Sequence, residues 1–297
     1  MSTPCLRLER AINKMVRDLA VPLTLADLAD AAHYSPWYLV RRFQSRYATT
    51  PQAFLWRLRL ETAASILQWQ PAMAIGKVAL MVGFSSAATF SRAFHREFGF
   101  TPSEWRKGAP AADAWRDRNL GDHSYKPGAA IVGTPADYHW SFAEVDALIS
   151  FEDWDTERVV FIREVGEYGC NLDLLWKRFR KTCTMYGIAP TRRYGLIWSD
   201  PATTPSGRRR YDAAQLIAPS VRIPRGLGEY KLQAGRWAVF RHHGPTDDIG
   251  PRWRDLMLTW VASAKVVLDP SRPRVERYAE DQYLVGHYEL CLPLMPE

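Results

Sequence analysis

Apolar residues recur every three or four positions through the first hundred residues, which is the spacing of one face of an α-helix. Within residues 7–20 these apolar side chains form a single stripe, made of Leu8, Ile12, Met15 and Leu19. We expect a supporting helix over this stretch. Helical spacing continues through residues 25–107, so the first third of the chain is predicted to be all-α.

One pattern occurs twice in this region. The first copy runs from Leu25 to Phe54 and the second from Ile75 to Trp105, at an offset of fifty residues before a turn and fifty-one after it. The matched positions after the turn are Leu39 with Phe90, Arg41 with Arg92, Phe43 with Phe94, Tyr47 with Phe98, Thr50-Pro51 with Thr101-Pro102 and Phe54 with Trp105. A steady offset over this many positions indicates an internal duplication.

Each copy has the local chemistry of a helix, a tight turn and a second helix. Gly83 can adopt the positive φ that ends the first helix of the second copy, and His33 occupies the matching position of the first copy. Ser35 then precedes Pro36 as N-cap and first helical residue, while Ser86 is the expected cap in the second copy. The sequence therefore predicts two helix-turn-helix motifs.

The second helix of each motif has a polar outer face. Leu39 and Phe43, or Phe90 and Phe94, lie four residues apart and are expected to point inward. The outward residues include Trp37, Tyr38, Arg41 and Ser45 in the first copy and Ala87, Ala88, Ser91 and Arg92 in the second. A helix with arginine and flat or hydrogen-bonding residues outward suits the major groove of DNA.

The spacing of the two copies favours DNA recognition over a purely structural role. A single pair of short amphipathic helices occurs in many helical proteins that bind no DNA. The stretch from Pro51 to Trp69 contains no Gly or internal Pro. As a helix, its nineteen residues would span roughly 28 Å, which is comparable to the ~34 Å of one DNA turn. Two readers on such a spacer match the periodicity of the duplex.

These motifs, with the run Phe98-Gly99-Phe100-Thr101-Pro102, resemble the DNA-binding domain of the AraC/XylS family of bacterial transcription regulators. The resemblance covers about the first 107 residues and is closest to the monomeric stress-response activators of the Mar, Sox and Rob type. It implies base contacts from the positions of Trp37, Tyr38, Val40 and Arg41, and of Ala87, Ala88, Ser91 and Arg92. Those relatives carry Gln at the positions of Val40, Ala87 and Ala88, and His at that of Tyr38. The preferred DNA sequence is therefore expected to differ from theirs.

Charge supports a polyanionic partner. The 297-residue chain is long enough for two domains and has a net charge of +7 with a pI near 9.3. The excess of basic residues lies in the part that carries the motifs. The four cysteines, Cys5, Cys170, Cys183 and Cys291, form no CxxC pattern and are expected to be reduced. With no long apolar run, we expect a cytoplasmic protein without membrane insertion.

The pattern changes after Trp105. Residues 108–118 are rich in Ala with Gly108 and Pro110, which is typical of a linker. Strands are predicted at Ala129–Val132, Val159–Glu164, Tyr194–Trp198, Tyr211–Ala218 and Trp237–His242, with a helix over residues 171–187. Residues 134–154 are expected to hold a helix or loop, and residues 221–235 to be irregular.

The later part of the chain contains a second echo. Val160 to Trp176 and Val239 to Trp253 both run strand, glycine, polar turn and a helix with a central tryptophan. With the segments near Tyr194, Tyr211 and the C-terminal stretch, residues 119–297 resemble the GyrI-like (SOUL-related) small-molecule-binding domain. The predicted fold is thus an all-α tandem helix-turn-helix domain (1–107), a linker (108–118) and an α+β domain of two similar halves (119–297). A cleft between such halves is a common ligand site.

Glu276 is the main candidate in this second domain. The resemblance implies that a carboxylate at this position lies in an aromatic pocket for large apolar, often cationic, ligands. Ring faces and a desolvated carboxylate both favour a cation. The alternatives are a glutamate on an exposed strand edge or one paired with Arg274 or Arg277. Candidate pocket walls, most of which are expected to be ordinary core, are Tyr168, Trp176, Trp198, Trp237, Trp253, Tyr278 and Tyr288.

Enzyme and metal functions find less support. His242 and His243 are adjacent, so on a strand they would point to opposite faces and could not easily share an ion. No GxSxG, HExxH or P-loop motif occurs, and no cofactor is expected. The first hypothesis is a transcription regulator, more an activator than a repressor, that binds double-stranded DNA as a monomer, senses a hydrophobic small molecule and contacts RNA polymerase. The alternative is a hydrolase of small lipophilic compounds built on the second domain.

Overall fold

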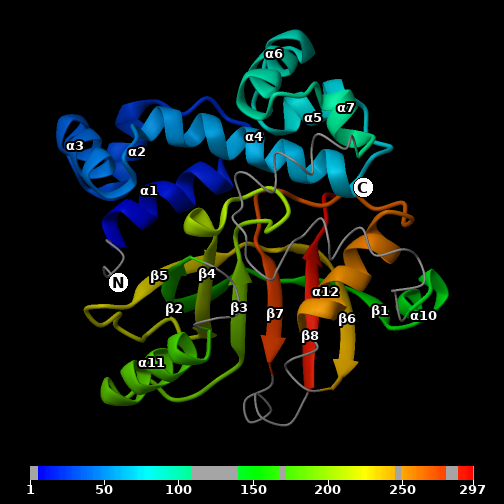
Figure 1. Ribbon diagram of the computed structural model, residues 1–297. Coiled ribbons are helices and arrows are strands. Elements are labelled where there is room, and N and C mark those ends of the chain that lie inside the picture. The colour runs from blue at the N-terminus through cyan, green and yellow to red at the C-terminus, as the bar shows by residue number, and fades with distance from the viewer. Residues whose placement is uncertain (1–5, 109–139, 167–171, 245–248, 279–286, 297) are drawn as a thin grey trace. The chain divides into compact units, whose positions relative to one another are not determined.

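The computed structural model describes residues 6–108, 140–166, 172–244, 249–278 and 287–296 (Figure 1). The chain divides into two compact units, Met1–Asn119 and Leu120–Glu297. The predicted strand Ala129–Val132 and nearly all of the predicted linker lie outside the described residues.

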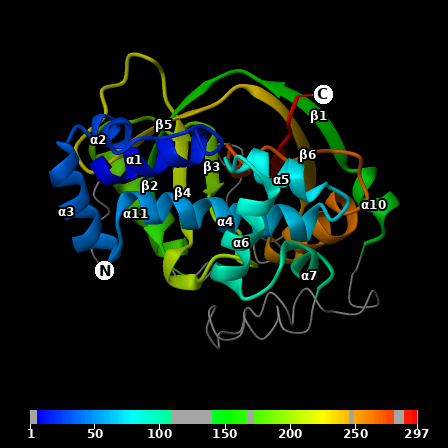
Figure 2. The same ribbon diagram turned by 90° about the horizontal axis from the view of Figure 1, so that it is seen from above.

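The first unit is helical, as predicted. Figure 2 shows α4 running lengthwise, with α2 and α3 near one end of it and α5, α6 and α7 near the other. The helices are α1 (Leu6–Arg17), α2 (Leu25–Ala32), α3 (Pro36–Tyr47), α4 (Pro51–Trp69), α5 (Ile75–Met81), α6 (Ala87–Phe98) and α7 (Pro102–Arg106). The predicted stripe on α1 and the residues after it is buried, with Leu8, Ile12 and Met15 fully enclosed and Leu19 nearly so.

The first motif is shaped by local backbone chemistry. Thr24 and Asp27 form a capping box at the start of α2, each bonding the other's backbone. His33 then adopts the left-handed conformation with φ of 53°, and Ser35 caps α3 by accepting from the amide of Tyr38. Pro36 follows as the first helical residue. The predicted helix-turn-helix is therefore present.

The second motif repeats this design with different residues. Gly83 has φ of +82° and ends the α5 segment, and the side chain of Ser86 accepts from the amide of Thr89 to cap α6. The duplication also extends to the end of the second helix. Ala48 ends α3 with φ of 52°, and Gly99, its equivalent, ends α6 with φ of 80°. The two helix-turn-helix motifs predicted from the sequence are confirmed.

Each motif is closed by an equivalent aromatic triad. In the first, the ring centroids of Phe43, Tyr47 and Phe54 lie 5.1 to 5.5 Å apart. In the second, Phe94, Phe98 and Trp105 lie 4.5 to 5.8 Å apart. These are the separations at which edge and tilted ring pairs are favourable. The triads fix the second helix of each motif to the helix that follows it.

The second unit is an α+β fold built on one sheet with strand order β1-β6-β8-β7-β3-β4-β2-β5. All of the strand pairs are antiparallel. In chain order the elements are α10 (Phe142–Asp146), β1 (Ile149–Trp154), β2 (Glu157–Val165), α11 (Leu172–Met185), β3 (Arg193–Ile197), the 3-10 turn Ser206–Arg208, β4 (Arg210–Leu216), β5 (Gly228–Leu232), β6 (Gly235–His243), α12 (Ile249–Asp255), a π-helical turn (Leu256–Val261), β7 (Arg274–Tyr278) and β8 (His287–Pro293).

The two predicted halves are visible in the strand order. Each half runs strand, strand, helix, strand, strand: β1-β2-α11-β3-β4 and then β5-β6-α12-β7-β8. Read from either edge, the sheet presents equivalent strands in the same order, and the halves join where β3 pairs with β7. The first strand of each half pairs with the other half, β1 with β6 and β5 with β2. This exchange ties the halves together.

Four of the described strands were not predicted: β7 and β8, which lie in the C-terminal stretch assigned only by resemblance, and the two edge strands β1 and β5. β1 lies in a stretch where the sequence indicated a helix or loop, and only α10 fits that expectation. β5 lies within residues 221–235, which were expected to be irregular. Both strands are short edges of the sheet, and β5 begins at Gly228. Their pairing with the other half, and not strong local propensity, holds them as strands.

We predict that Ala48→Gly stabilises the protein. Ala48 occupies a left-handed helix end, where a residue with a Cβ costs about 1–2 kcal/mol more than glycine. Part of that gain is offset by the greater freedom of glycine in the unfolded chain, leaving an expected increase in the free energy of unfolding of about 0.5–1 kcal/mol. Chemical denaturation followed by circular dichroism would measure it. The reciprocal Gly99→Ala should destabilise, and a fall in stability for Ala48→Gly would contradict the strain argument.

Candidate functional site

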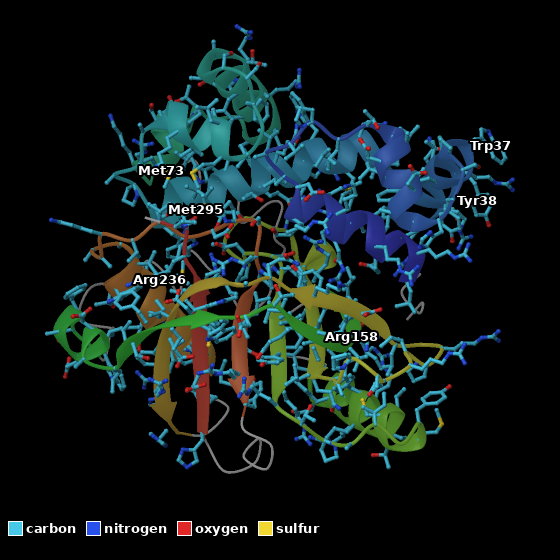
Figure 3. All side chains as sticks on the ribbon, turned by 180° about the vertical axis from the view of Figure 1, so that it is seen from behind. Trp37, Tyr38, Met73, Arg158, Arg236 and Met295 are labelled. Carbon is cyan, nitrogen blue, oxygen red and sulfur yellow. The ribbon has the colours of Figure 1, made fainter. Side chains whose placement is uncertain are left out.

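The outward face of α3 is exposed as the sequence predicted. Leu39 and Phe43 are fully buried, while Trp37 is 69% exposed and Tyr38 39% exposed. Figure 3 shows Trp37 and Tyr38 projecting outward from α3. The guanidinium carbon of Arg41 lies 5.6 Å from the Trp37 ring centroid, within the range of a cation–π contact. Of the other candidates on this helix, Ser45 is exposed and Val40 is half-buried.

The corresponding face of α6 carries smaller side chains. Phe90 and Phe94 are fully buried, so the opposite side of the helix is left free. Ala87, Ala88 and Arg92 are exposed and Ser91 is half-buried. The candidate residues of α3 are thus large aromatic and cationic groups, whereas those of α6 are two methyl groups, a hydroxyl and one guanidinium.

The net charge of the chain lies on the unit that bears these helices. Residues 1–119 contain sixteen Lys and Arg against nine Asp and Glu, a balance of +7 that equals the net charge of the whole chain. Residues 120–297 contain equal numbers of the two kinds and are neutral. Long-range attraction to a polyanion therefore comes from the helical unit.

In the second unit, Glu276 lies on β7 at the junction of the two halves. Its register partner across that junction is Gly195 on β3. A Cβ at Gly195 would lie 2.1 Å from the hydroxyl oxygen of Tyr211 and 2.4 Å from Oε2 of Glu276. Because no side chain could share that space, Gly195 leaves room for the carboxylate and the phenol to meet over β3.

Three donors converge on the Glu276 carboxylate. The hydroxyls of Tyr211 and Tyr278 donate to Oε2 at 2.6 and 2.9 Å, and the indole Nε1 of Trp253 donates to Oε1 at 3.0 Å. Glu276 is only 5% exposed. Burial raises its pKa above the ordinary value of 4.5, and the hydrogen bonds from Tyr211, Trp253 and Tyr278 act in the opposite direction.

Glu276 is neither on an exposed strand edge nor paired with Arg274 or Arg277. It is buried and not on an exposed edge. Arg274 instead bonds Asp200 at 3.0 Å, and Arg277 bonds Glu152 at 2.9 Å and also Glu289. Among the described residues no ion pair to Glu276 is present, so a buried carboxylate is held by neutral donors alone.

The structure brings together some of the predicted wall residues. Trp253 and Tyr278 bond Glu276 directly, and the ring of Trp176 meets that of Tyr278 edge-on at 5.7 Å. Tyr288 is the register partner of Tyr278 on β8 and so lies on the same face of the sheet. We call these four residues with Glu276 the carboxylate cluster.

Other predicted wall residues lie elsewhere. The indole of Trp198 donates to Asp212 at 2.7 Å, on the face of β4 opposite to Tyr211. Trp237 stacks on Trp154 at 4.4 Å, on that same opposite face. Tyr168 lies outside the described residues.

Tyr211 was missed by sequence reasoning, although it makes the shortest bond to Glu276. It starts a predicted strand, and its alternation with Ala213 places both on one face. The strand pairing that sets that face next to Glu276 could not be read from local pattern. As predicted, the adjacent His242 and His243 lie on opposite faces of β6, where their register partners are Tyr288 and His287.

Both units are similar to known protein families. Residues 28–108 match the model of a helix-turn-helix domain, and residues 149–294 match that of the GyrI-like small molecule binding domain. The chain is 38% identical over 86 residues to the probable transcription factor PqrA of Proteus vulgaris, covering 29% of this chain and 70% of that protein. The chain belongs to the AraC-type family of transcription regulators.

Other AraC-type relatives match this chain over about a third of its length. The RCS-specific HTH-type transcriptional activator RclR of Escherichia coli is 36% identical over 101 residues, which is 34% of this chain. The match spans about a third of RclR's length, 35%. The AraC-type regulators similar to this chain are transcription factors, and AraC-type domains bind double-stranded DNA.

Two solved structures are similar to parts of this AraC-type chain. A transcriptional regulator with an AraC-type DNA-binding domain from Chromobacterium violaceum shares 32% identity, with a TM-score of 0.33, over 35% of this chain and 94% of that one. SAV2435 bound to tetraphenylphosphonium shares 14% identity, with a TM-score of 0.39, over 50% of this chain and 93% of that one.

The described residues hold neither a membrane-spanning helix nor a metal-binding cluster. None of the helices there is long and apolar enough to cross a membrane. Within the same residues, no three His, Cys, Asp or Glu side chains gather as a metal site would require.

In this AraC-type regulator the raised pKa of Glu276 has a predicted consequence for stability. The folded state disfavours the charged carboxylate, so the contribution of Glu276 to folding is greatest below pH 4.5 and is lost as the pH rises through its folded-state pKa. Glu276→Gln removes this titration. Urea denaturation across pH should show the variant gaining stability relative to wild type from acidic to neutral pH.

Glu152→Gln is the matched control. Burial acts to raise the pKa of Glu152, but the bonds from Arg277 and Trp154 and the charges of Arg277 and Arg241 leave it below its ordinary value. Its contribution is therefore present above its unfolded pKa and lost as the pH falls, and Glu152→Gln should lose stability toward neutral pH. A Glu276→Gln difference that does not vary with pH would contradict the burial argument.

Proposed function

We propose that this chain is a transcription regulator that inserts α3 and α6 into successive major-groove segments of one duplex and senses a small apolar molecule at the carboxylate cluster. The proposal rests mainly on one observation: α3 and α6, each with an N-cap and an exposed outer face, lie on the same strongly basic unit. We assign DNA binding to residues 1–107 and effector binding to residues 119–297, with 108–118 as the linker.

The length of α4 supports simultaneous binding by both motifs. Its nineteen residues correspond to roughly 28 Å of helix, and successive segments of the major groove on one face are ~34 Å apart. Because both motifs lie on one chain, a single copy can occupy both segments. We therefore propose binding as a monomer to an asymmetric site.

The exposed side chains indicate how sequence is read. Arg41 can donate to both O6 and N7 of a guanine, and Trp37 holds that guanidinium from one side. Tyr38, Val40 and Ser45 complete the α3 surface. On α6, Arg92 is the second guanine reader, Ser91 offers a hydroxyl, and the methyl groups of Ala87 and Ala88 suit contact with thymine methyl groups. Phosphate contacts supply most of the affinity and its dependence on salt.

The carboxylate cluster supports an apolar cation as effector. A buried carboxylate without an ionic partner is costly, and a bound cation would relieve that cost. Ring faces from Trp176, Trp253, Tyr278 and Tyr288 would stabilise the same charge. Trp253 is only partly buried and stands on α12, directly before a π-helical turn. π-Helical turns are frequent at functional sites, and displacement of Trp253 would open Oε1 to a ligand.

A hydrolase is the weaker candidate. The named relatives are transcription factors, and the three groups that contact the Glu276 carboxylate are hydrogen-bond donors that hold it in place. We therefore propose no enzymatic activity and no cofactor. A regulator of this kind acts in the cytoplasm, where it contacts RNA polymerase at the promoters it occupies.

Replacement of Arg41 by Ala should weaken binding at one base position. We expect a cost of about 1–3 kcal/mol on the selected site and relaxed preference at that position. Arg96→Ala, which removes an exposed charge from the last turn of α6, should weaken binding to selected and random DNA alike. Fluorescence anisotropy on both duplexes would compare them. Equal losses on the two duplexes for Arg41→Ala would contradict base reading.

Effector binding is expected to require the Glu276 charge. Titration with tetraphenylphosphonium should quench tryptophan fluorescence saturably, because Trp253 contacts the carboxylate. Glu276→Gln should weaken the apparent affinity by about tenfold or more, as expected when a desolvated charge pair is lost. Glu152→Gln, on the opposite face, should leave it unchanged. Quenching that survives Glu276→Gln unaltered would remove Glu276 from the site.

A further inference from the structure

Arg59 lies at the middle of α4 and joins it to the chain that follows α1. Its Nε donates to the carbonyl oxygen of Leu19 at 3.0 Å and its Nη2 to that of Val21 at 2.9 Å. Both acceptors belong to the short connection between α1 and α2. Burial lowers the pKa of Arg59 below its ordinary value, yet a guanidinium stays protonated in proteins. One side chain therefore anchors the base of the first motif to α4.

The same guanidinium also supports the turn of the second motif. A Cβ at Gly83 would lie 2.8 Å from Cζ of Arg59, 2.9 Å from its Nη2 and 2.7 Å from the carbonyl oxygen of Leu19. The backbone of Gly83 therefore packs directly against Arg59 and Leu19. Gly99 also has positive φ, but a Cβ added there would have no other atom within 4 Å. Gly83 is needed for close approach as well as for backbone conformation.

These contacts make Arg59 a joint between the two motifs. On one side it bonds the connection that leads into α2, and on the other it abuts the turn that leads into α6. One helical turn earlier on α4, the ring of Trp56 packs edge-on against Phe84, the residue after Gly83, at 4.8 Å. A planar guanidinium with donors in a fixed fork resists rotation about such a joint better than a flexible ammonium would.

We propose that Arg59 is a positioning residue that fixes the separation and rotation of α3 relative to α6, and thereby the half-site spacing that this chain accepts. The inference rests on the proposed function, since it requires both helices to enter one duplex. One extra base pair moves a half-site by about 3.4 Å and turns it by about 34°. A rigid joint cannot follow that displacement, whereas a loose one can.

A residue that only stabilised the fold would behave differently. Losing Arg59 would then lower the fraction of folded protein, and binding would weaken by the same factor at every spacing. A positioning residue changes the shape of the spacing profile. The profile therefore separates the two roles.

The experiment uses the full-length chain and a site selected by it from a random duplex library. Synthetic duplexes then carry the two half-sites at the selected spacing and with one or two base pairs added or removed. For wild type we expect one preferred spacing and about tenfold weaker binding for each single-base-pair change, the loss that a mismatch of about 1.4 kcal/mol would give. A wild-type chain indifferent to spacing, or a selected site with one half alone, would overturn the proposed two-helix function itself.

Arg59→Met keeps the apolar stem and removes the donors. We expect its profile to flatten, so that a one-base-pair change costs less than about threefold where wild type loses tenfold. Arg57→Met is the matched control, because it removes the same charge from the same helix and breaks one surface ion pair with Glu97 at 3.6 Å. It should retain the wild-type profile.

Two further variants keep the proposal testable if Arg59→Met does not fold. Arg59→Lys retains charge and stem with a flexible donor, and its profile should be intermediate. Gly83→Ala retains Arg59 but places a carbon against the guanidinium, so its profile should broaden or shift, while Gly99→Ala should not alter the preferred spacing. Wild-type sharpness and optimum in Arg59→Met, or in both Arg59→Lys and Gly83→Ala, would overturn the proposal.

Discussion

Helix α4 is packed by elements of both helix-turn-helix motifs, and this shared packing decides how α3 and α6 are presented. At its start, Phe54 completes the aromatic triad of the first motif. Toward its end, the carbonyl of Ala64 accepts from the indole of Trp105, which belongs to the triad of the second. Each motif alone would expose the apolar side that it turns toward α4. Helix α4 therefore contributes to the hydrophobic core of both motifs and sets the distance between α3 and α6. The net positive charge of the unit favours DNA as the partner of these two helices.

The second unit is also built from two similar halves, which here form one β-sheet. Two halves exchange their first strands and meet at β3 and β7, where Gly195 faces Glu276. The junction is where the halves cease to be equivalent, since one supplies a glycine and the other a carboxylate. Desolvation at that place keeps the pKa of Glu276 high, and neutral donors hold it. A group so placed is sensitive to any cation that can reach it.

Local pattern sufficed for much of this fold because the helical motifs depend on local chemistry. Each cap or turn in these motifs acts on residues only a few positions away, so a short stretch of sequence is enough to predict it. This holds for Thr24, Ser35, Ser86 and Gly83. The edge strands β1 and β5 depend on partners from the other half of the sheet, and their sequences alone did not reveal them. For the same reason the sequence picked out Glu276 but not Tyr211, which strand pairing brings to it from 65 residues away. The role of Arg59 was also not predicted, because its partners Leu19 and Gly83 lie far from it in the sequence.

Hydroxyl-radical footprinting of the full chain on its selected duplex tests most directly whether one rigid unit places two helices in the groove. The expected result is two protected patches on one face of the DNA, centred about ten base pairs apart, with no requirement for a second copy of the chain. A single protected patch, or two patches that fall on opposite faces of the duplex, would contradict the arrangement of α3 and α6 on α4.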